Sequence, residues 1–302
     1  MNEISCADFP KRPRVIYTAN AQYGNEAFKF WAASHVEHGV KLLIGQHGGN
    51  YGAALWSSQE NHESRISDMY VSWGWKRESG SNILPLPSGQ LSYVSKKIRP
   101  DPSGSITLIP MTLSRYSYWL YSIPVGPQIA DYIKGQEKFV DALSIDARSF
   151  LEIRSPLNSY EFGWSTYERW KDFDPKIKIR GPETSLYKLL CGSRLSVCTY
   201  NATTILEVLA ANFPTIIFWD PNFFELRDSA QPYYDELRKV SILHDTPKSA
   251  AIKVNEVYED PMAWWGSPDV QMARENFCRR FAWTSPDWIS DWKKEFEKLI
   301  TR

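Results

Sequence analysis

Short apolar runs of strand length alternate with amphipathic stretches of helical length along most of the chain. Residues 15–18 form a β-rich run, and an amphipathic stretch at residues 26–38 follows it and ends at Gly39, a typical helix stop. Residues 41–45 then have the composition of a buried strand, and a glycine-rich turn comes next. This order predicts a βαβ unit.

A second alternating series begins with an apolar run at residues 105–111. It is clearest between residues 182 and 221, where a helix, a strand, a tight polar loop at residues 200–204, a second helix and a second strand follow one another. Alternating β and α segments of these lengths predict a parallel, doubly wound sheet. The fold class that we expect is therefore α/β, with Rossmann-type parallel sheets.

The two series are separated by residues 76–102, which are rich in Ser, Gly, Pro and charge and show no sustained helical period. A chain of 302 residues can hold two domains of modest size. We therefore expect one Rossmann-like lobe over residues 1–80, a linker over 81–104, a second Rossmann-like domain over 105–268, and C-terminal helices over 269–302 that pack back across the lobes.

Charge argues against one class of partner, whereas the aromatic content allows two interpretations. The 35 basic and 35 acidic residues balance, without the clustered basic excess of nucleic-acid-binding domains, so we expect no nucleic-acid partner. The 13 Trp and 16 Tyr suit sugar faces, because their rings combine a flat apolar body with a polar edge. A thick hydrophobic core would use the same residues.

The cysteines and the apolar runs indicate the compartment. Cys6, Cys191, Cys198 and Cys278 form no CxxC pair or zinc pattern, which predicts neither a metal site nor a disulfide framework. The N-terminus has no apolar region typical of a signal peptide, and the longest apolar runs have only strand length. We therefore expect a cytoplasmic protein with reduced cysteines.

Ligands of open parallel sheets bind beyond the carboxyl ends of the strands, where helix N-termini attract phosphates. The loop at residues 200–204 lies at such a place, and Asn201 and Thr203 could add side-chain donors to a phosphate. Thr204 and Glu207 have the spacing of a capping box, so the pattern fits a structural cap as well as a binding site. Glu207 could instead accept a hydrogen bond from a ribose or sugar hydroxyl.

A second candidate loop spans residues 45–52, where four glycines in eight residues let the backbone approach a ligand closely. We assign Gly48, Gly49 and Tyr51 to donor binding. His47 could donate to a phosphate or act as an acid, although a histidine in a turn is often only a solvated polar residue.

Three arginines at predicted strand ends, Arg115, Arg154 and Arg180, could hold phosphate or carboxylate oxygens. Surface ion pairs are the alternative for each of them. We assign Arg154 to donor binding first, because it follows its predicted strand without a spacer.

At these residues the sequence resembles a known family. Phe28-Lys29-Phe30-Trp31-Ala32-Ala33 and the segment at residues 41–52 are similar to GT-B transferases of bacterial capsule and lipopolysaccharide loci. The resemblance to retaining Kdo transferases, which use a CMP-activated acidic sugar, is more distant. Residues 199–221 resemble the donor-binding βαβ unit of GT-B C-domains in general.

The resemblance implies a GT-B-like fold in which residues 1–80 are the C-terminal part of an acceptor-side lobe and residues 105–268 bind the donor nucleotide. Family members are longer at the N-terminus, so the N-terminal lobe is expected to be truncated, as in a fragment or a split gene product that lacks a partner half. The family also carries acidic residues in the loop that is here 22–25. Only Glu26 remains at its edge as a candidate catalytic carboxylate.

The implied reaction moves a sugar, with a CMP-activated ulosonic acid as the candidate donor, from a nucleotide to a surface-polysaccharide acceptor. The nucleotide sugar is a substrate, and no cofactor or metal is required because helix N-termini and arginines can carry the leaving group's charge. A position at the periphery of the inner membrane is compatible with such an acceptor. Two alternatives stay open: a sugar-nucleotide or glycerophosphate enzyme on the same fold, and a truncated, non-catalytic domain that binds a nucleotide or a partner.

Overall fold

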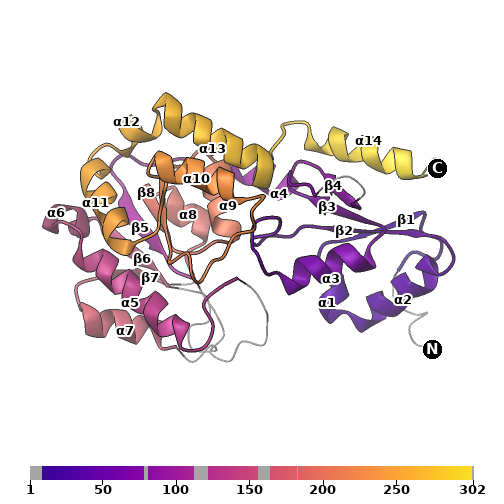
Figure 1. Ribbon diagram of the computed structural model, residues 1–302, viewed down its shortest axis with the longest axis horizontal. Coiled ribbons are helices and arrows are strands. Elements are labelled where there is room, and N and C mark those ends of the chain that lie inside the picture. Colours follow the sequence, from indigo (N-terminus) through magenta and orange to yellow (C-terminus); the bar gives the residue numbers. More distant parts are fainter. Residues whose placement is uncertain (1–8, 78–80, 112–121, 156–163, 182, 301–302) are drawn as a thin grey trace.

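The computed structural model describes residues 9–77, 81–111, 122–155, 164–181 and 183–300 and contains two parallel sheets in two lobes (Figure 1). The first sheet has the order β1-β2-β3-β4. Its strands are β1 (Val15–Thr18), β2 (Lys41–Gly45), β3 (Met69–Ser72) and β4 (Ile83–Pro85). Their side chains are largely buried, as the apolar runs predict.

The second sheet has six parallel strands in the order β10-β9-β8-β5-β6-β7. They are β5 (Ser105–Ile109), β6 (Leu151–Arg154), β7 (Lys178–Arg180), β8 (Ser193–Cys198), β9 (Thr215–Phe218) and β10 (Leu243–His244). This is the doubly wound order, in which the chain starts in the middle, builds one half and returns to build the other. The order reverses between β5 and β8, and that position is where such sheets bind ligands.

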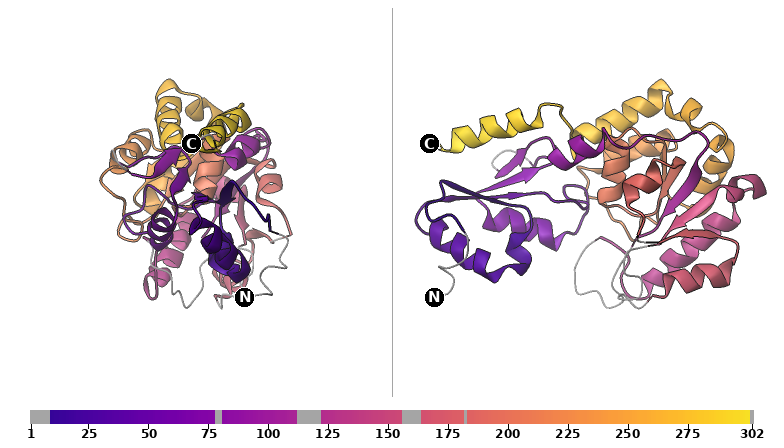
Figure 2. Two further views of the ribbon diagram at one scale, coloured as in Figure 1. Left: turned by 90° about the vertical axis from the view of Figure 1, so that its right-hand side faces the viewer. Right: turned by 180° about the vertical axis from the view of Figure 1, so that it is seen from behind.

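Helices cover both sheets (Figure 2). In the first lobe they are α1 (Ala21–Gly24), α2 (Glu26–Val36) and α3 (Ser58–Ile66), and α4 (Gly89–Val94) follows β4. The second lobe carries α5 (Gln128–Asp141), α6 (Ile145–Ser149), α7 (Thr166–Phe173), α8 (Leu186–Leu190), α9 (Thr203–Ala210), α10 (Gln231–Lys239), α11 (Pro247–Val257), α12 (Pro261–Trp265) and α13 (Pro268–Phe281). The last helix is α14 (Trp288–Ile300).

Side-chain caps fix the starts of α2 and α3. The Asn25 side chain accepts a hydrogen bond from the Phe28 N–H (2.9 Å), and Ser57 accepts one from Glu60 N–H (3.3 Å). Each cap satisfies a backbone donor that has no partner inside its helix. One hydrophobic cluster runs through both lobes, from Ile16 and Tyr70 to Phe277, and each sheet has a separate smaller cluster on its other face.

The chain crosses back to the first lobe at its C-terminal end. The Trp283 N–H donates to the Trp73 carbonyl (3.0 Å), and α14 then lies over the first sheet, as Figures 1 and 2 show. Trp292, Phe296 and Leu299 pack there against the buried side chain of Leu43 and its neighbours. The apolar side of the amphipathic helix α14 therefore covers one face of the first sheet.

We expected residues 81–104 to be a linker. The structure differs from this prediction, because the segment contains β4 and α4. A three-residue strand and a six-residue helix are too short to show a hydrophobic period, which explains why the sequence pattern missed them. Where one domain ends and the next begins stays a prediction.

Candidate functional site

A cavity of about 330 Å³ lies at the position where the strand order of the second sheet reverses. It is bounded by loops that follow β5, β6 and β8, together with a loop of the first lobe. Its lining residues are Gly49, Asn50, Tyr51, Gln59, Pro110, Met111, Ile123, Arg154, Tyr200, Asn201 and Ala202. Four of the predicted donor-binding residues are among them: Gly49, Tyr51, Arg154 and Asn201.

The wall after β8 offers hydrogen-bond donors. Asn201 is buried, and its Oδ1 accepts a hydrogen bond from the Tyr234 hydroxyl (2.9 Å). This bond fixes the amide, and no described residue accepts from its NH₂ group. α9 begins at Thr203 with Ala202 as its N-cap residue and without a side-chain cap, so the positive end of the helix faces the cavity wall.

Arg154 is the one charged side chain among the described residues that line the cavity. It forms no ion pair with a described carboxylate, although its charge partly offsets the rise that burial causes in the pKa of Glu207. Arg180, by contrast, donates two hydrogen bonds to Glu152 (2.8 Å each) and so forms an ion pair, the alternative to ligand binding. Arg115 lies outside the described residues.

The glycine-rich loop of the first lobe touches the start of α9. The Gly49 N–H donates to Thr203 Oγ1 (2.8 Å). A Cβ atom on Gly48 would lie 2.3 Å from the same oxygen, and Gly48 has a φ of +153°. Glycine is therefore required for this approach, and it brings together two loops that the sequence could only place separately.

A buried carboxylate ties the lobes together beside this contact. Glu60 of α3 accepts hydrogen bonds from Arg227 of the second lobe (2.9 and 3.2 Å), from Arg77 (2.7 Å) and from the Gly52 N–H (2.7 Å). An antiparallel bridge joins Ala54 to residue 226 next to it. The cavity thus lies next to the hydrogen bonds and the β-bridge that connect the two lobes.

His47 does not itself line the cavity, but it lies in the same loop as Gly49, which does, and next to the buried carboxylate of Glu63. Its side chain is 29 % exposed, and its Nδ1 lies 3.7 Å from Glu63 Oε1. The rings of Tyr23 and Tyr51 lie edge-on to the imidazole, at centroid distances of 6.2 and 5.6 Å. Burial lowers the pKa of His47.

Glu63 was not foreseen from the sequence. Its side chain is fully buried, and its Oε1 accepts hydrogen bonds from the Tyr23 hydroxyl (2.6 Å), the Tyr51 hydroxyl (3.2 Å) and Gln22 Nε2 (3.3 Å). Burial raises the pKa of Glu63 to about 7, although these bonds act in the opposite direction. Buried groups with shifted pKa values gather at functional sites. The surrounding sequence is polar throughout, so nothing in it marks Glu63 as buried.

Glu26, the predicted catalytic carboxylate, lies on the surface. Its side chain is 71 % exposed and forms an ion pair with Lys29 (2.6 Å) at the start of α2. It does not line the cavity and makes no contact with the Glu63 cluster. The first turn of a helix favours an acidic residue for electrostatic reasons alone, which accounts for its presence.

The predicted capping box of Thr204 and Glu207 is wrong. Thr204 lies inside α9 and its hydroxyl forms a hydrogen bond with the Tyr200 hydroxyl (2.6 Å). Glu207 is buried and accepts hydrogen bonds from Tyr187 (3.0 Å) and Gln90 (3.1 Å). The helix starts before Thr204, so the spacing of these two residues does not match its first turn. Neither residue lines the cavity.

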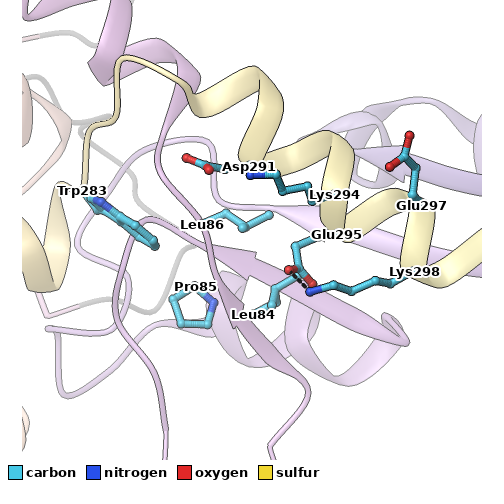
Figure 3. A pocket seen from close by; sticks show the side chains of 9 residues that line it. All are labelled: Leu84, Pro85, Leu86, Trp283, Asp291, Lys294, Glu295, Glu297 and Lys298. Atoms are coloured by element: carbon cyan, nitrogen blue, oxygen red, sulfur yellow. Dashed lines mark hydrogen bonds and ion pairs between the residues drawn. The ribbon is translucent and has the colours of Figure 1, made fainter.

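A larger cavity of about 550 Å³ lies between α14 and the end of β4 (Figure 3). Leu84, Pro85, Leu86 and Trp283 form its apolar part, and charged side chains of α14 border it. One of these, Glu295, is paired with Lys298 (2.6 Å). This cavity contains none of the predicted site residues and does not lie at the strand-order reversal, so we place the candidate site in the smaller one.

Comparison with known proteins identifies the family of the chain. Residues 2–296 match the model described as the LIC12162 family transferase. The chain belongs to this family of transferases. No curated protein matches the sequence significantly. Among the described residues, no helix combines the length and apolar character needed to cross a membrane.

Solved structures share the architecture. HepE of Anabaena in complex with UDP-glucose is 13 % identical with a TM-score of 0.51, and the match covers 96 % of this chain and 79 % of HepE. A UDP-N-acetylglucosamine 2-epimerase is 7 % identical with a TM-score of 0.50, and the coverage is 95 % and 74 %. MurG of Acinetobacter baumannii is 11 % identical with a TM-score of 0.49, and the coverage is 94 % and 73 %. The first two similarities show the fold, and the predicted two-lobed, Rossmann-like GT-B class is confirmed.

Proposed function

We propose that this transferase moves a sugar from a nucleotide-activated donor to a surface-polysaccharide acceptor. The observation that supports this most is the cavity at the strand-order reversal, which brings Arg154 and Asn201 to the positive end of α9. Doubly wound sheets bind nucleotides at this position. The cavity borders on the first lobe, from which an acceptor can reach the sugar.

In this proposal, the wall after β8 holds the donor phosphate. Asn201 supplies its NH₂ group, Thr203 its hydroxyl hydrogen and Arg154 a positive charge. Gly49 lets the first-lobe loop close over the phosphate, and His47 stabilises the charge that grows on it as the sugar departs. Such fixed donors and charges act on the developing negative charge without having to reorganise.

The donor that we propose is a CMP-activated ulosonic acid, on the resemblance to Kdo transferases. One cation and one helix N-terminus match a single phosphate better than they match a diphosphate, because each additional phosphate charge needs its own compensation. The lining of the cavity supports this choice, with Arg154 as its one charged side chain among the described residues.

Calorimetry with CMP, CDP, UDP and GDP, and with the bare nucleosides, tests the proposal. We expect Asn201→Ala and Arg154→Met each to weaken nucleotide binding by about 1.5–3 kcal/mol, the range for a hydrogen bond to a charged group. Binding of the nucleoside should hardly change. Arg180→Met is the matched control, because Arg180 is paired with Glu152 outside the cavity, and it should bind normally. Equal losses for nucleotide and nucleoside would contradict a phosphate contact.

Product analysis separates sugar transfer from the alternatives on this fold. Turnover should require a glycan acceptor, whereas an epimerase converts the nucleotide sugar without one. Nucleotide binding without turnover for any acceptor would instead favour a non-catalytic domain.

A further inference from the structure

Four buried polar atoms of the first lobe have no hydrogen-bond partner among the described residues: Gln22 Oε1, His47 Nδ1, Glu63 Oε2 and the Tyr70 hydroxyl. The hydrogen bonds from Gln22, Tyr23 and Tyr51 all reach Oε1 of Glu63, and the Tyr70 hydroxyl also faces this carboxylate. An unpaired buried polar atom costs about 1–3 kcal/mol. Gln22 Oε1 and the ionised Glu63 Oε2 can only accept, so a proton held on Oε2 or on His47 would add a donor to the one that the Tyr70 hydroxyl supplies.

The cluster is connected to the donor cavity through two residues. Tyr51 is one of the residues that line the cavity, and its hydroxyl donates to Glu63 (3.2 Å). His47 lies in the loop that touches α9 through Gly49, and its imidazole is partly exposed. Tyr51 and the loop that carries His47 therefore connect the cluster to the lining of the cavity.

We propose that Glu63 and His47 share one proton, and that binding of the donor's phosphate draws this proton onto His47, so that a charged imidazole faces the leaving group. This inference rests on the proposed function, because the phosphate must bind in the cavity. Glu63 is then a positioning residue, which acts on the substrate through His47.

The charged and titratable groups around the pair support this assignment. Among the described residues, His47 is the one basic side chain within ion-pair distance of Glu63. Tyr23, Tyr51 and Tyr70 face the carboxylate from α1, the glycine-rich loop and β3. Glu60 adds a negative charge on α3 and is compensated by its two arginines. His62 on α3 is exposed and lies near the Tyr23 ring (6.4 Å).

The expected pH dependence follows from the buried positions of the pair. Burial raises the pKa of Glu63 to about 7 and lowers that of His47, so the free pair loses its proton above neutral pH. A phosphate anion beside His47 favours the charged imidazole and raises the proton affinity of the pair. Nucleotide binding at pH 8 should therefore take up a proton.

The experiment is calorimetry at pH 8 in buffers of different ionisation enthalpy, with whichever of CMP, CDP, UDP or GDP binds most tightly. At this pH the terminal phosphate is already doubly charged before it binds. We expect the native protein to take up about one proton per nucleotide, and its affinity to fall by up to about tenfold per pH unit above 7. Glu63→Gln and His47→Gln should both abolish the uptake. His62→Gln, the matched control, should keep it.

The outcomes separate this inference from the proposed function. If the native protein binds no nucleotide, the proposed function fails. If it binds without proton uptake, or if Glu63→Gln or His47→Gln keeps the uptake, or if His62→Gln loses it, the inference is overturned while nucleotide binding stands. The measurement on the native protein decides the question even if Glu63→Gln does not fold.

Discussion

Arg227→Met tests whether the buried Glu60 carboxylate joins the two lobes energetically as well as geometrically. Arg227 donates two hydrogen bonds to Glu60 across the lobe boundary (2.9 and 3.2 Å) and a third, from Nε, to the Ala54 carbonyl (2.9 Å). Methionine keeps much of the apolar stem and removes all three bonds. The substitution therefore isolates the polar part of the contact.

The expected loss follows from what remains around the carboxylate. A hydrogen bond to a charged group contributes about 1.5–3 kcal/mol, but Glu60 keeps its bonds from Gly52 and Arg77. The charge is therefore not left uncompensated, and we expect a loss of about 2–3 kcal/mol, below the roughly 3–5 kcal/mol for breaking a buried pair outright. Arg77→Met removes one bond from a side chain that is 39 % exposed, and solvent screening limits its loss to less than about 1 kcal/mol.

Urea unfolding followed by tryptophan fluorescence measures both variants. The free energy of unfolding should fall more for Arg227→Met than for Arg77→Met. Two separate transitions in Arg227→Met alone would show in addition that the bond couples the unfolding of the lobes. Equal losses in the two variants, or a loss below about 0.5 kcal/mol for Arg227→Met, would refute the role assigned to this contact.

Three further substitutions have defined outcomes. Gly48→Ala should lower the free energy of unfolding by about 1–3 kcal/mol more than Gly39→Ala, because both have positive φ but only Gly48 meets a neighbouring atom. Thr204→Ala should cost about 1 kcal/mol in urea unfolding through the lost Tyr200 bond, and Thr204→Ser should restore it. Glu63 binds its proton more tightly in the folded state, so its contribution to stability is present at low pH and is lost as pH rises from about 4.5 to 7. Glu63→Gln should lack this decline of roughly 3 kcal/mol, and identical pH profiles of the two proteins would contradict the raised pKa.

The positions of most strands could be predicted from local sequence pattern. Apolar runs such as Lys41–Gly45 are buried strands because a parallel sheet that is covered on both faces needs near-continuous apolar residues. The same alternation indicated two parallel sheets, and strand-end placement put Gly49, Arg154 and Asn201 at the cavity lining. These features depend on neighbours in the sequence and on the general geometry of α/β sheets.

Which polar residues are buried, and what they contact, depends on the packing of segments that are distant in the sequence. Glu26 and Glu63 both lie in first-lobe helices, yet one is exposed and the other fully buried, because the tyrosines and His47 that enclose Glu63 come from other parts of the chain. The T-x-x-E spacing of Thr204 and Glu207 matched a helix cap. In the structure the Thr204 hydroxyl instead forms a hydrogen bond with the Tyr200 hydroxyl. Burial and the pKa of a side chain depend on such long-range neighbours, and a linear pattern does not specify them.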